Sequence, residues 1–261
     1  MNERQGKQII RSGKPVALPD RLYKYYENGV SLESLLKDCS IFLSSPVRFN
    51  DPFDCCLNFD TEMSDEQWAD WFRETGKKLR MQSALPETDK YIDNKIWKDG
   101  SVIEGILIGI RSAFQSHGIC CFSEVNDDIL MWSHYADKHQ GVCVEFRPRY
   151  HEDPFARIVQ VTYPQKYPSI KLCEEDRIEE MFAAKSKHWE YEKEWRVILA
   201  ESADSSQKIY PDEISGIIFG CQIRPDDEVK VIRWIHDSFV KPNLYRSIKQ
   251  SDDFSLKIQS I

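Results

Sequence analysis

Residues 189–199 bring acidic, basic and aromatic side chains together where a polar stretch leads into a predicted β-strand. Side chains alternate between the two faces of a strand, so Glu192, Glu194 and Arg196 share one face and Trp195 lies on the other. Carboxylates beside a guanidinium group could bind and act on a polar ligand. Solvated ion pairing is the simpler interpretation of the same residues, and the sequence leaves both open.

A second polar and aromatic cluster lies on a short strand predicted over residues 21–26. Tyr23 and Tyr25 share one face of this strand, and Lys24 lies on the other. Two phenolic hydroxyl groups with an ammonium group nearby could hold a nucleobase or a phosphate. A half-buried strand with a solvated lysine is the structural alternative.

Residues 46–54 and the end of a later strand supply further polar groups. Two prolines and the pair Asn50 and Asp51 predict an ordered irregular loop rather than a strand. The amide and carboxylates of this loop suit ribose hydroxyl groups or a buried turn equally well. Ser123 ends the buried strand predicted over residues 119–123, where polar groups are presented beyond a sheet edge.

A helix predicted over residues 127–136 places His134 beside Tyr135 within one turn. His139 is five residues from His134, so the two do not share the helix face that a two-histidine metal site needs. No metal is therefore expected. The sequence also has no glycine-rich nucleophile elbow, phosphate loop or dinucleotide fingerprint, which argues against common hydrolase, nucleoside triphosphatase and Rossmann chemistry.

The composition indicates a globular protein with a large core. The 261 residues are 41% hydrophobic and 12% aromatic, which suits one large domain or two small ones. No apolar run approaches the roughly 20 residues that span a bilayer, and the first residues lack the apolar core of a signal peptide, so we expect a cytoplasmic protein without membrane contact. The net charge of −8 argues against a broad basic surface for nucleic acid, although a local basic patch stays open.

Hydrophobic spacing and turn residues predict a mixed order of strands and helices. Besides the strand within 189–199, the predicted strands cover residues 21–26, 41–44, 119–123, 142–146, 158–163, 214–220 and 254–258. The predicted helices cover residues 31–38, 64–80, 106–114, 127–136, 174–187 and 226–239. Because strands and helices do not alternate strictly, the class is α+β, with a mainly antiparallel or mixed central sheet, flanking helices and an inserted α-hairpin.

The domain organisation follows from the same pattern. We expect residues 1–20 to form a polar N-terminal tail and residues 21–261 to form a single α+β domain. Residues 60–117 hold the inserted helices, which could act as a lid.

Six motifs occur in an order that resembles a bacterial family known as domain of unknown function 2971. The resemblance extends from about residue 21 to residue 220. It rests on residues 22–25, 49–54, 121–124, 130–136, 141–146 and 191–196. Since that family has no settled activity, the resemblance implies a shared fold, and the function has to be inferred from the residues themselves.

The order of the elements also resembles the ADP-ribosyltransferase fold. In that fold a first strand anchors NAD, a second supplies a hydroxyl group, and a late strand supplies a glutamate that stabilises the positive charge formed as nicotinamide leaves. The resemblance assigns the anchor to Lys24 or Tyr25 and the glutamate to Glu194. Ser44 or Ser45 takes the hydroxyl position. The first strand departs from the usual His or Arg, because this sequence has Tyr-Lys-Tyr there.

The leading hypothesis is a nucleotide-handling enzyme, an ADP-ribosyltransferase or NAD glycohydrolase effector in bacterial stress or phage defence. NAD is the expected substrate, and a protein or nucleic acid is the expected acceptor. The alternatives are a non-catalytic ligand-sensing or protein-binding module and a metal-independent nuclease-like effector. The expected catalytic residues are Glu194, His134 and Tyr135. The expected cofactor-binding residues are Tyr23, Lys24, Tyr25, Ser44, Ser45, Asn50, Asp51, Ser123 and Arg196.

Overall fold

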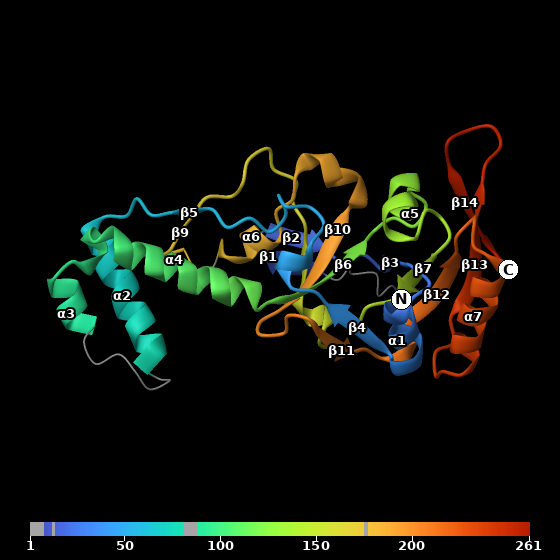
Figure 1. The fold of residues 1–261 in the computed structure, drawn as a ribbon, viewed down its shortest axis with the longest axis horizontal. Helices are drawn as coiled ribbons and strands as arrows, with labels where there is room; N and C mark the ends of the chain where they lie inside the picture. Colours follow the sequence, from blue (N-terminus) through green and yellow to red (C-terminus); the bar gives the residue numbers. More distant parts are fainter. Residues whose placement is uncertain (1–7, 12–13, 81–87, 175–176) are drawn as a thin grey trace, which may run out of the picture.

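An eight-stranded sheet forms the centre of the molecule (Figure 1). The computed structural model describes residues 8–11, 14–80, 88–174 and 177–261. The strands of this sheet are β3 (Leu22–Tyr26), β6 (Gly118–Ser123), β7 (Val142–Phe146), β8 (Ile158–Gln160), β10 (Glu194–Leu199), β12 (Ile214–Phe219), β13 (Asn243–Lys249) and β14 (Leu256–Ser260). Their order is β14-β13-β12-β7-β3-β6-β10-β8. β12 and β13 run parallel and the other neighbours antiparallel, which confirms the predicted α+β class with a mixed sheet.

Three pairs of short strands lie outside this sheet. They are β1 (Gln8–Arg11) with β2 (Lys14–Ala17), β4 (Ser40–Leu43) with β11 (Ser205–Lys208), and β5 (Phe59–Asp60) with β9 (Ile170–Lys171). The first pair lies within the predicted polar N-terminal tail, residues 1–20. There Gln8 pairs with Ala17 and Arg11 with Lys14 through backbone hydrogen bonds.

Helices cover both faces of the sheet. α1 (Val30–Asp38) and α7 (Pro225–His236) pack on one face, and α5 (Ile129–Tyr135) packs on the other. The first face buries Leu32, Leu35, Leu36, Val231 and Trp234 against Phe146, Trp195 and Phe219. The second face buries Met131 and Trp132 against Tyr25, Cys143 and Ile218. The helices predicted over residues 31–38, 127–136 and 226–239 are therefore confirmed, with ends shifted by a few residues.

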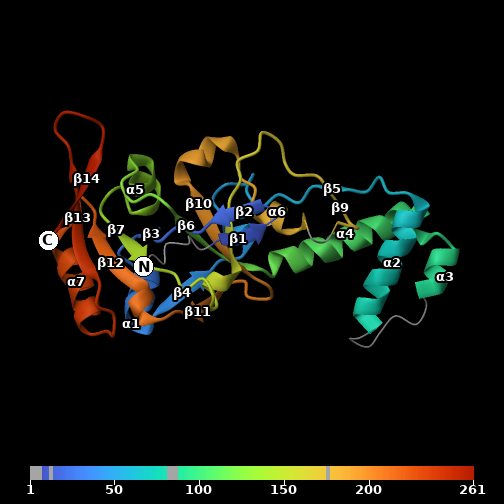
Figure 2. The same ribbon diagram turned by 180° about the vertical axis from the view of Figure 1, so that it is seen from behind.

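A helical arm projects from one end of the molecule, opposite to α7, β13 and β14 (Figures 1 and 2). It consists of α2 (Asp65–Arg80), α3 (Thr88–Asp93) and α4 (Gly100–Gln115). Trp68 and Trp97 belong to a separate buried cluster in this arm. Near the end of α4, Phe114 stacks on Phe182 with ring centroids 3.8 Å apart. Helices are present where residues 60–117 were expected to hold them, and the role of a lid stays a prediction.

The helix predicted over residues 174–187 is wrong in extent, because α6 (Glu179–Phe182) is four residues long. The amide of Thr162 donates to the carbonyl of Ala183 at 2.7 Å, and the amide of Lys185 donates to the carbonyl of Thr162 at 3.0 Å. These bonds hold the chain after α6 in an extended bridge. Tertiary pairing thus overrides the local helical preference. Residues 175 and 176 lie outside the described part of the chain. Throughout the described ranges, no helix is long and apolar enough to cross a bilayer.

Candidate functional site

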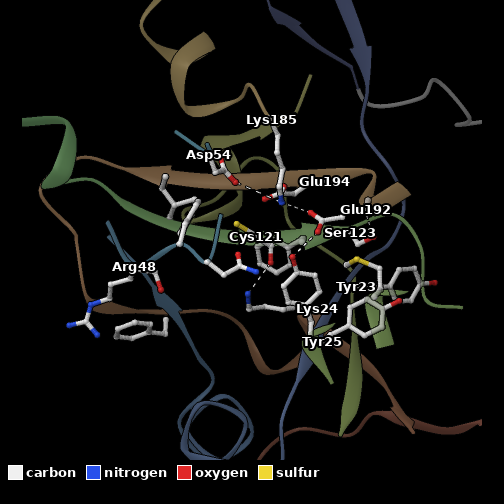
Figure 3. Close-up of a pocket in the computed structure, with 18 residues that line it drawn as sticks. Tyr23, Lys24, Tyr25, Arg48, Asp54, Cys121, Ser123, Lys185, Glu192 and Glu194 are labelled. Atoms are coloured by element: carbon white, nitrogen blue, oxygen red, sulfur yellow. Dashed lines mark hydrogen bonds and ion pairs between the residues drawn. The ribbon is translucent and has the colours of Figure 1, made fainter. Parts of the chain in front are cut away.

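A cavity of about 290 Å³ lies beside β3, where the central sheet splits (Figure 3). β3 pairs with β7 along its whole length. Toward β6, the register joins Tyr23 to Ser123. Past that pair the Nζ atom of Lys24 donates a hydrogen bond of 3.0 Å to the carbonyl of Cys121 in β6. A lysine side chain therefore occupies a place where backbone pairing would otherwise continue the sheet.

Lys185 stands at the centre of a buried charge network in the wall of this cavity (Figure 3). Its Nζ atom donates to Oε2 of Glu192 at 2.5 Å and to Oε2 of Glu194 at 3.0 Å. It also lies 3.7 Å from Oδ2 of Asp54. All four side chains are at most 6% exposed. One ammonium group thus faces three buried carboxylates, so a second cation is needed to compensate them.

Arg196 is that second cation, and it is 0% exposed. Its Nε and Nη2 atoms donate to the two carboxylate oxygens of Glu194 at 2.7 and 3.1 Å. Its Nη1 and Nη2 atoms donate to the two oxygens of Asp54 at 2.8 and 2.7 Å. Nη1 also donates to the carbonyl of Phe182 at 2.7 Å. The whole guanidinium fork is engaged by protein acceptors.

The two glutamates of the network have opposite electrostatic environments. Burial alone would raise the pKa of Glu194, but the charges of Arg196 and Lys185 outweigh it and hold that pKa well below the usual value. Burial also raises the pKa of Glu192, and here the attraction of Lys185 does not reverse the effect. Lys185 itself stays protonated, because the two glutamates raise its pKa against the effect of burial. The environment of Glu194 therefore favours its ionised form, and Glu192 is the carboxylate that takes up a proton more readily.

A short 3-10 helix, Lys187–Glu192, and the residue after it position these two glutamates. Lys193 adopts a left-handed backbone conformation with a φ of 42°, which is uncommon for a residue other than glycine. β10 begins at Glu194. The predicted sharing of one strand face by Glu192 and Glu194 is therefore wrong. The two side chains meet at Lys185 because a helical turn and a left-handed residue redirect the chain between them.

Eight residues predicted for the site do line this one cavity, although they come from distant parts of the sequence. They are Tyr23, Lys24, Tyr25, Ser44, Asn50, Ser123, Tyr135 and Glu194. The hydroxyl of Tyr135 donates to Oε1 of Glu192 at 2.7 Å, which joins α5 to the charge network. The hydroxyl of Ser123 donates to the backbone carbonyl of Glu192 at 2.5 Å.

His134 and Asp51 do not line the cavity, contrary to expectation. Successive residues of a helix point about 100° apart, so an inward Tyr135 leaves His134 facing outward. His134 is exposed and lies against Trp189, with ring centroids 6.2 Å apart, in a shallow neighbouring hollow that Asp51 also lines. The carboxylate of Asp51 accepts a hydrogen bond of 2.9 Å from the amide of Phe53, so it stabilises the loop turn.

Ser45 and Arg196 also differ from their predicted roles. The hydroxyl of Ser45 donates to the carbonyl of Gln115 at 2.9 Å, which ties the loop after β4 to the end of α4. Arg196 lies beneath the cavity wall and acts on it through Glu194 and Asp54. Arg196 itself is not among the residues that line the cavity.

Three residues of the network were not assigned to the site from sequence: Asp54, Lys185 and Glu192. Asp54 is the second carboxylate of the polar loop, so the loop pattern contained a signal for it. Lys185 had none, because it lies in a segment predicted as a regular helix. Glu192 was recognised as a neighbour of Glu194, but on the basis of an incorrect strand.

The fold and the cavity define an α+β protein with a buried charge network beside a split in its sheet. Residues 131–197 match the model of a family described as "Protein of unknown function (DUF2971)". The matched stretch runs from α5 to β10 and includes Tyr135, Lys185, Glu192 and Glu194. The match supports the family resemblance over these residues. Searches among curated proteins and among solved structures found no match.

Proposed function

We propose that the protein is a nucleotide-handling enzyme whose ligand brings a negative charge to Lys24. The supporting observation is the difference between the two lysines in the cavity wall. Lys185 is compensated by carboxylates, whereas Lys24 donates to a backbone carbonyl and has no carboxylate of the described residues within ion-pair distance. The charge of Glu194 acts on Lys24 only from beyond ion-pair distance. A partly buried ammonium group without a direct ion-pair partner favours an anionic ligand, because a charge-assisted hydrogen bond then offsets its loss of hydration.

The rest of the lining suits the ring and sugar of a nucleotide. Tyr25, Phe49 and Tyr135 offer aromatic surface, and Asn50 offers an amide for hydroxyl groups. A volume of about 290 Å³ lies near the lower limit of small-molecule sites, about 300 Å³. The cavity would thus enclose one ring with its ribose, and the remainder of a dinucleotide would extend toward the exposed side chain of Arg48, which lies to one side in Figure 3.

The more specific proposal is an ADP-ribosyltransferase or NAD glycohydrolase that serves in bacterial stress or phage defence. The resemblance to that fold assigned three positions to Lys24 or Tyr25, to Ser44 or Ser45, and to Glu194, and of these residues all but Ser45 line the same cavity. An ionised Glu194 is suited to stabilising the positive charge that develops on ribose as nicotinamide leaves. This supports NAD as the substrate, with water, a protein or a nucleic acid as the acceptor.

Calorimetry with NAD, ADP-ribose and ATP, together with mass spectrometry for released nicotinamide, tests this proposal. We expect Lys24→Gln to weaken nucleotide binding at least about tenfold, which corresponds to about 1.4 kcal/mol. Lys24→Arg keeps the charge and should retain most of the affinity. Lys37→Gln is the matched control, because Lys37 is an exposed lysine of α1 that pairs with Glu33.

The outcomes separate the general proposal from the specific one. Nucleotide binding that is insensitive to Lys24→Gln, or no nucleotide binding at all, would refute the general proposal. Binding of NAD without release of nicotinamide, and without slowed growth of the expressing cells, would refute the specific proposal of NAD consumption. The general proposal of nucleotide binding would still hold.

One observation favours a non-catalytic sensing module as the second candidate. Both carboxylate oxygens of Glu194 already accept hydrogen bonds from Arg196 or Lys185, so little of this group is free for a substrate. A sensor would bind the nucleotide through Lys24 and change conformation without turnover. The same two assays distinguish it, because it predicts binding with no released nicotinamide.

A further inference from the structure

We propose that Glu192, rather than Glu194, is the group of this cavity that exchanges a proton with the ligand. This inference rests on the proposed function for its ligand, but the protonation behaviour of Glu192 can be measured on the protein alone. The two neighbouring carboxylates then have different roles: Glu194 remains an anion, and Glu192 alternates between two protonation states.

Glu194 is bound too firmly to exchange protons. Arg196 donates to both of its oxygens, at 2.7 and 3.1 Å, and Lys185 donates to Oε2 at 3.0 Å. These three hydrogen bonds all come from charged donors, and they stabilise the ionised form. To take up a proton, Glu194 would have to give up an ion pair with an arginine that is 0% exposed. Glu194 is thus suited to a fixed electrostatic role.

Glu192 is bound differently, although it is equally buried. Among the residues that the structure describes, its cationic partner is Lys185, which it shares with Glu194 and Asp54. Its other oxygen accepts from the neutral hydroxyl of Tyr135 at 2.7 Å. Burial raises the pKa of Glu192, and the negative charge of Glu194 acts in the same direction. Two carboxylates in one site whose environments separate their pKa values are typical of acid–base pairs in enzymes.

Glu192 is one of the residues that line the cavity. The groups that act on its charge are Lys185 after α6, Tyr135 on α5, Glu194 on β10, Tyr163 after β8 and the preceding Tyr191. Tyr135 is half-buried and lines the cavity together with Glu192. Its hydroxyl lies next to the carboxylate, so it holds Oε1 in place and orients it.

In the proposed step, water or a hydroxyl group of the ligand donates the proton to Glu192. The ionised Glu192 accepts the proton, so an O–H bond of the donor breaks and an O–H bond forms on the carboxylate. The electron pair stays on the donor oxygen, which bonds to the anomeric carbon of the ribose. The C–N bond to nicotinamide breaks, and nicotinamide leaves as a neutral molecule with the electrons of that bond. The proton on Glu192 then returns to solvent, and Lys185 and Tyr135 keep their protons throughout.

Carboxyl-carbon NMR of protein labelled in its glutamates tests the first half of the inference without any ligand. Glu192→Gln identifies the signal of Glu192 by its disappearance, and Glu190→Gln is the matched control, because Glu190 is an exposed glutamate of the same 3-10 helix. We expect the Glu192 signal to titrate above the usual midpoint of about 4.3. A midpoint at or below that value would overturn the assignment, whether or not a nucleotide binds.

The second half is tested by the pH profile of NAD turnover. Glu192→Gln should lower the rate about 100-fold or more and remove the acidic limb of the profile, and Glu192→Asp should restore part of both. An unchanged rate and profile in Glu192→Gln would refute proton exchange by this residue. If the unmodified protein releases no nicotinamide, the proposed NAD chemistry fails instead, and the NMR midpoint still decides the state of Glu192.

Discussion

Replacing Arg196 by methionine should destabilise the protein strongly, because it leaves buried carboxylates without their cation. Arg196 makes five hydrogen bonds of 2.7 to 3.1 Å to Asp54, Glu194 and the carbonyl of Phe182, and it is 0% exposed. Methionine fills similar space without any donor. Breaking a buried ion pair by removing one partner costs about 3–5 kcal/mol, and we expect a loss in that range at pH 7.

The loss should depend on pH in a defined direction. The pKa of Glu194 is lowered in the folded protein, so its contribution to stability is complete above its unfolded pKa, about 4.3, and declines as the pH falls below it. In the methionine variant the orphaned carboxyl groups titrate at higher pH. The deficit relative to the unmodified protein should therefore shrink between pH 7 and pH 5, by about 1.4 kcal/mol for each unit by which such a pKa exceeds 5.

Urea unfolding followed by tryptophan fluorescence measures both effects. Arg73→Met is the matched control, because Arg73 pairs with Asp70 on the surface, where the two side chains are 51% and 63% exposed. That control should change the free energy of unfolding by less than about 1 kcal/mol. A loss below about 1 kcal/mol for Arg196→Met, or a deficit that grows on acidification, would refute the account of the buried network.

Two further predictions concern the packing of the core and the stability of the protein at low pH. Trp195→Ala should lower the free energy of unfolding by about 3–5 kcal/mol in urea titrations, because the indole is 0% exposed and its Nε1 donates to Glu124 at 2.6 Å; a loss below about 1 kcal/mol would contradict its place in the core. The contribution of Glu194 to the stability of the unmodified protein should hold down to about pH 4.3 and be lost progressively below it, since the pKa of Glu194 is lowered on folding. Glu192, whose pKa is raised, adds stability as the pH falls toward about 4.3 and no more below that pH. Circular dichroism across an acid titration checks this, and a stability that rises below pH 4 would contradict it.

Sequence patterns predicted most of the central sheet, because buried strands have a local signature. Residues 142–146 were predicted as a strand and form β7 with the same bounds. The strand β13, which lies between β12 and the edge strand β14, was missed, since its polar and charged residues show no continuous apolar run. The helix expected over residues 174–187 failed for another reason: hydrogen bonds to Thr162, distant in sequence, decide the conformation there.

The candidate site was predictable in its parts but not in its chemistry. The clusters around Lys24, Asn50, Tyr135 and Glu194 could be recognised as polar groups among aromatic residues, and they converge on one cavity. The charge state of Glu194 could be recognised only in part, because it depends on Lys185, for which the sequence has no signal, as well as on the neighbouring Arg196. This changes how a Glu194→Gln variant should be interpreted, since the substitution removes buried ion pairs as well as a reactive group.

The buried network also joins segments that lie far apart along the chain. The bond between Arg196 and Asp54 closes a loop of 142 residues, and that between Tyr135 and Glu192 closes one of 57. Contacts of such long range form late in folding, because the chain entropy lost in closing each loop is recovered only once the intervening elements are in place. The segment 131–197 that matches the family model contains Arg196 but not Asp54. Excised from the chain, it would carry a guanidinium group without one of its two carboxylates, so we expect the matched segment to be less stable alone than within the whole chain.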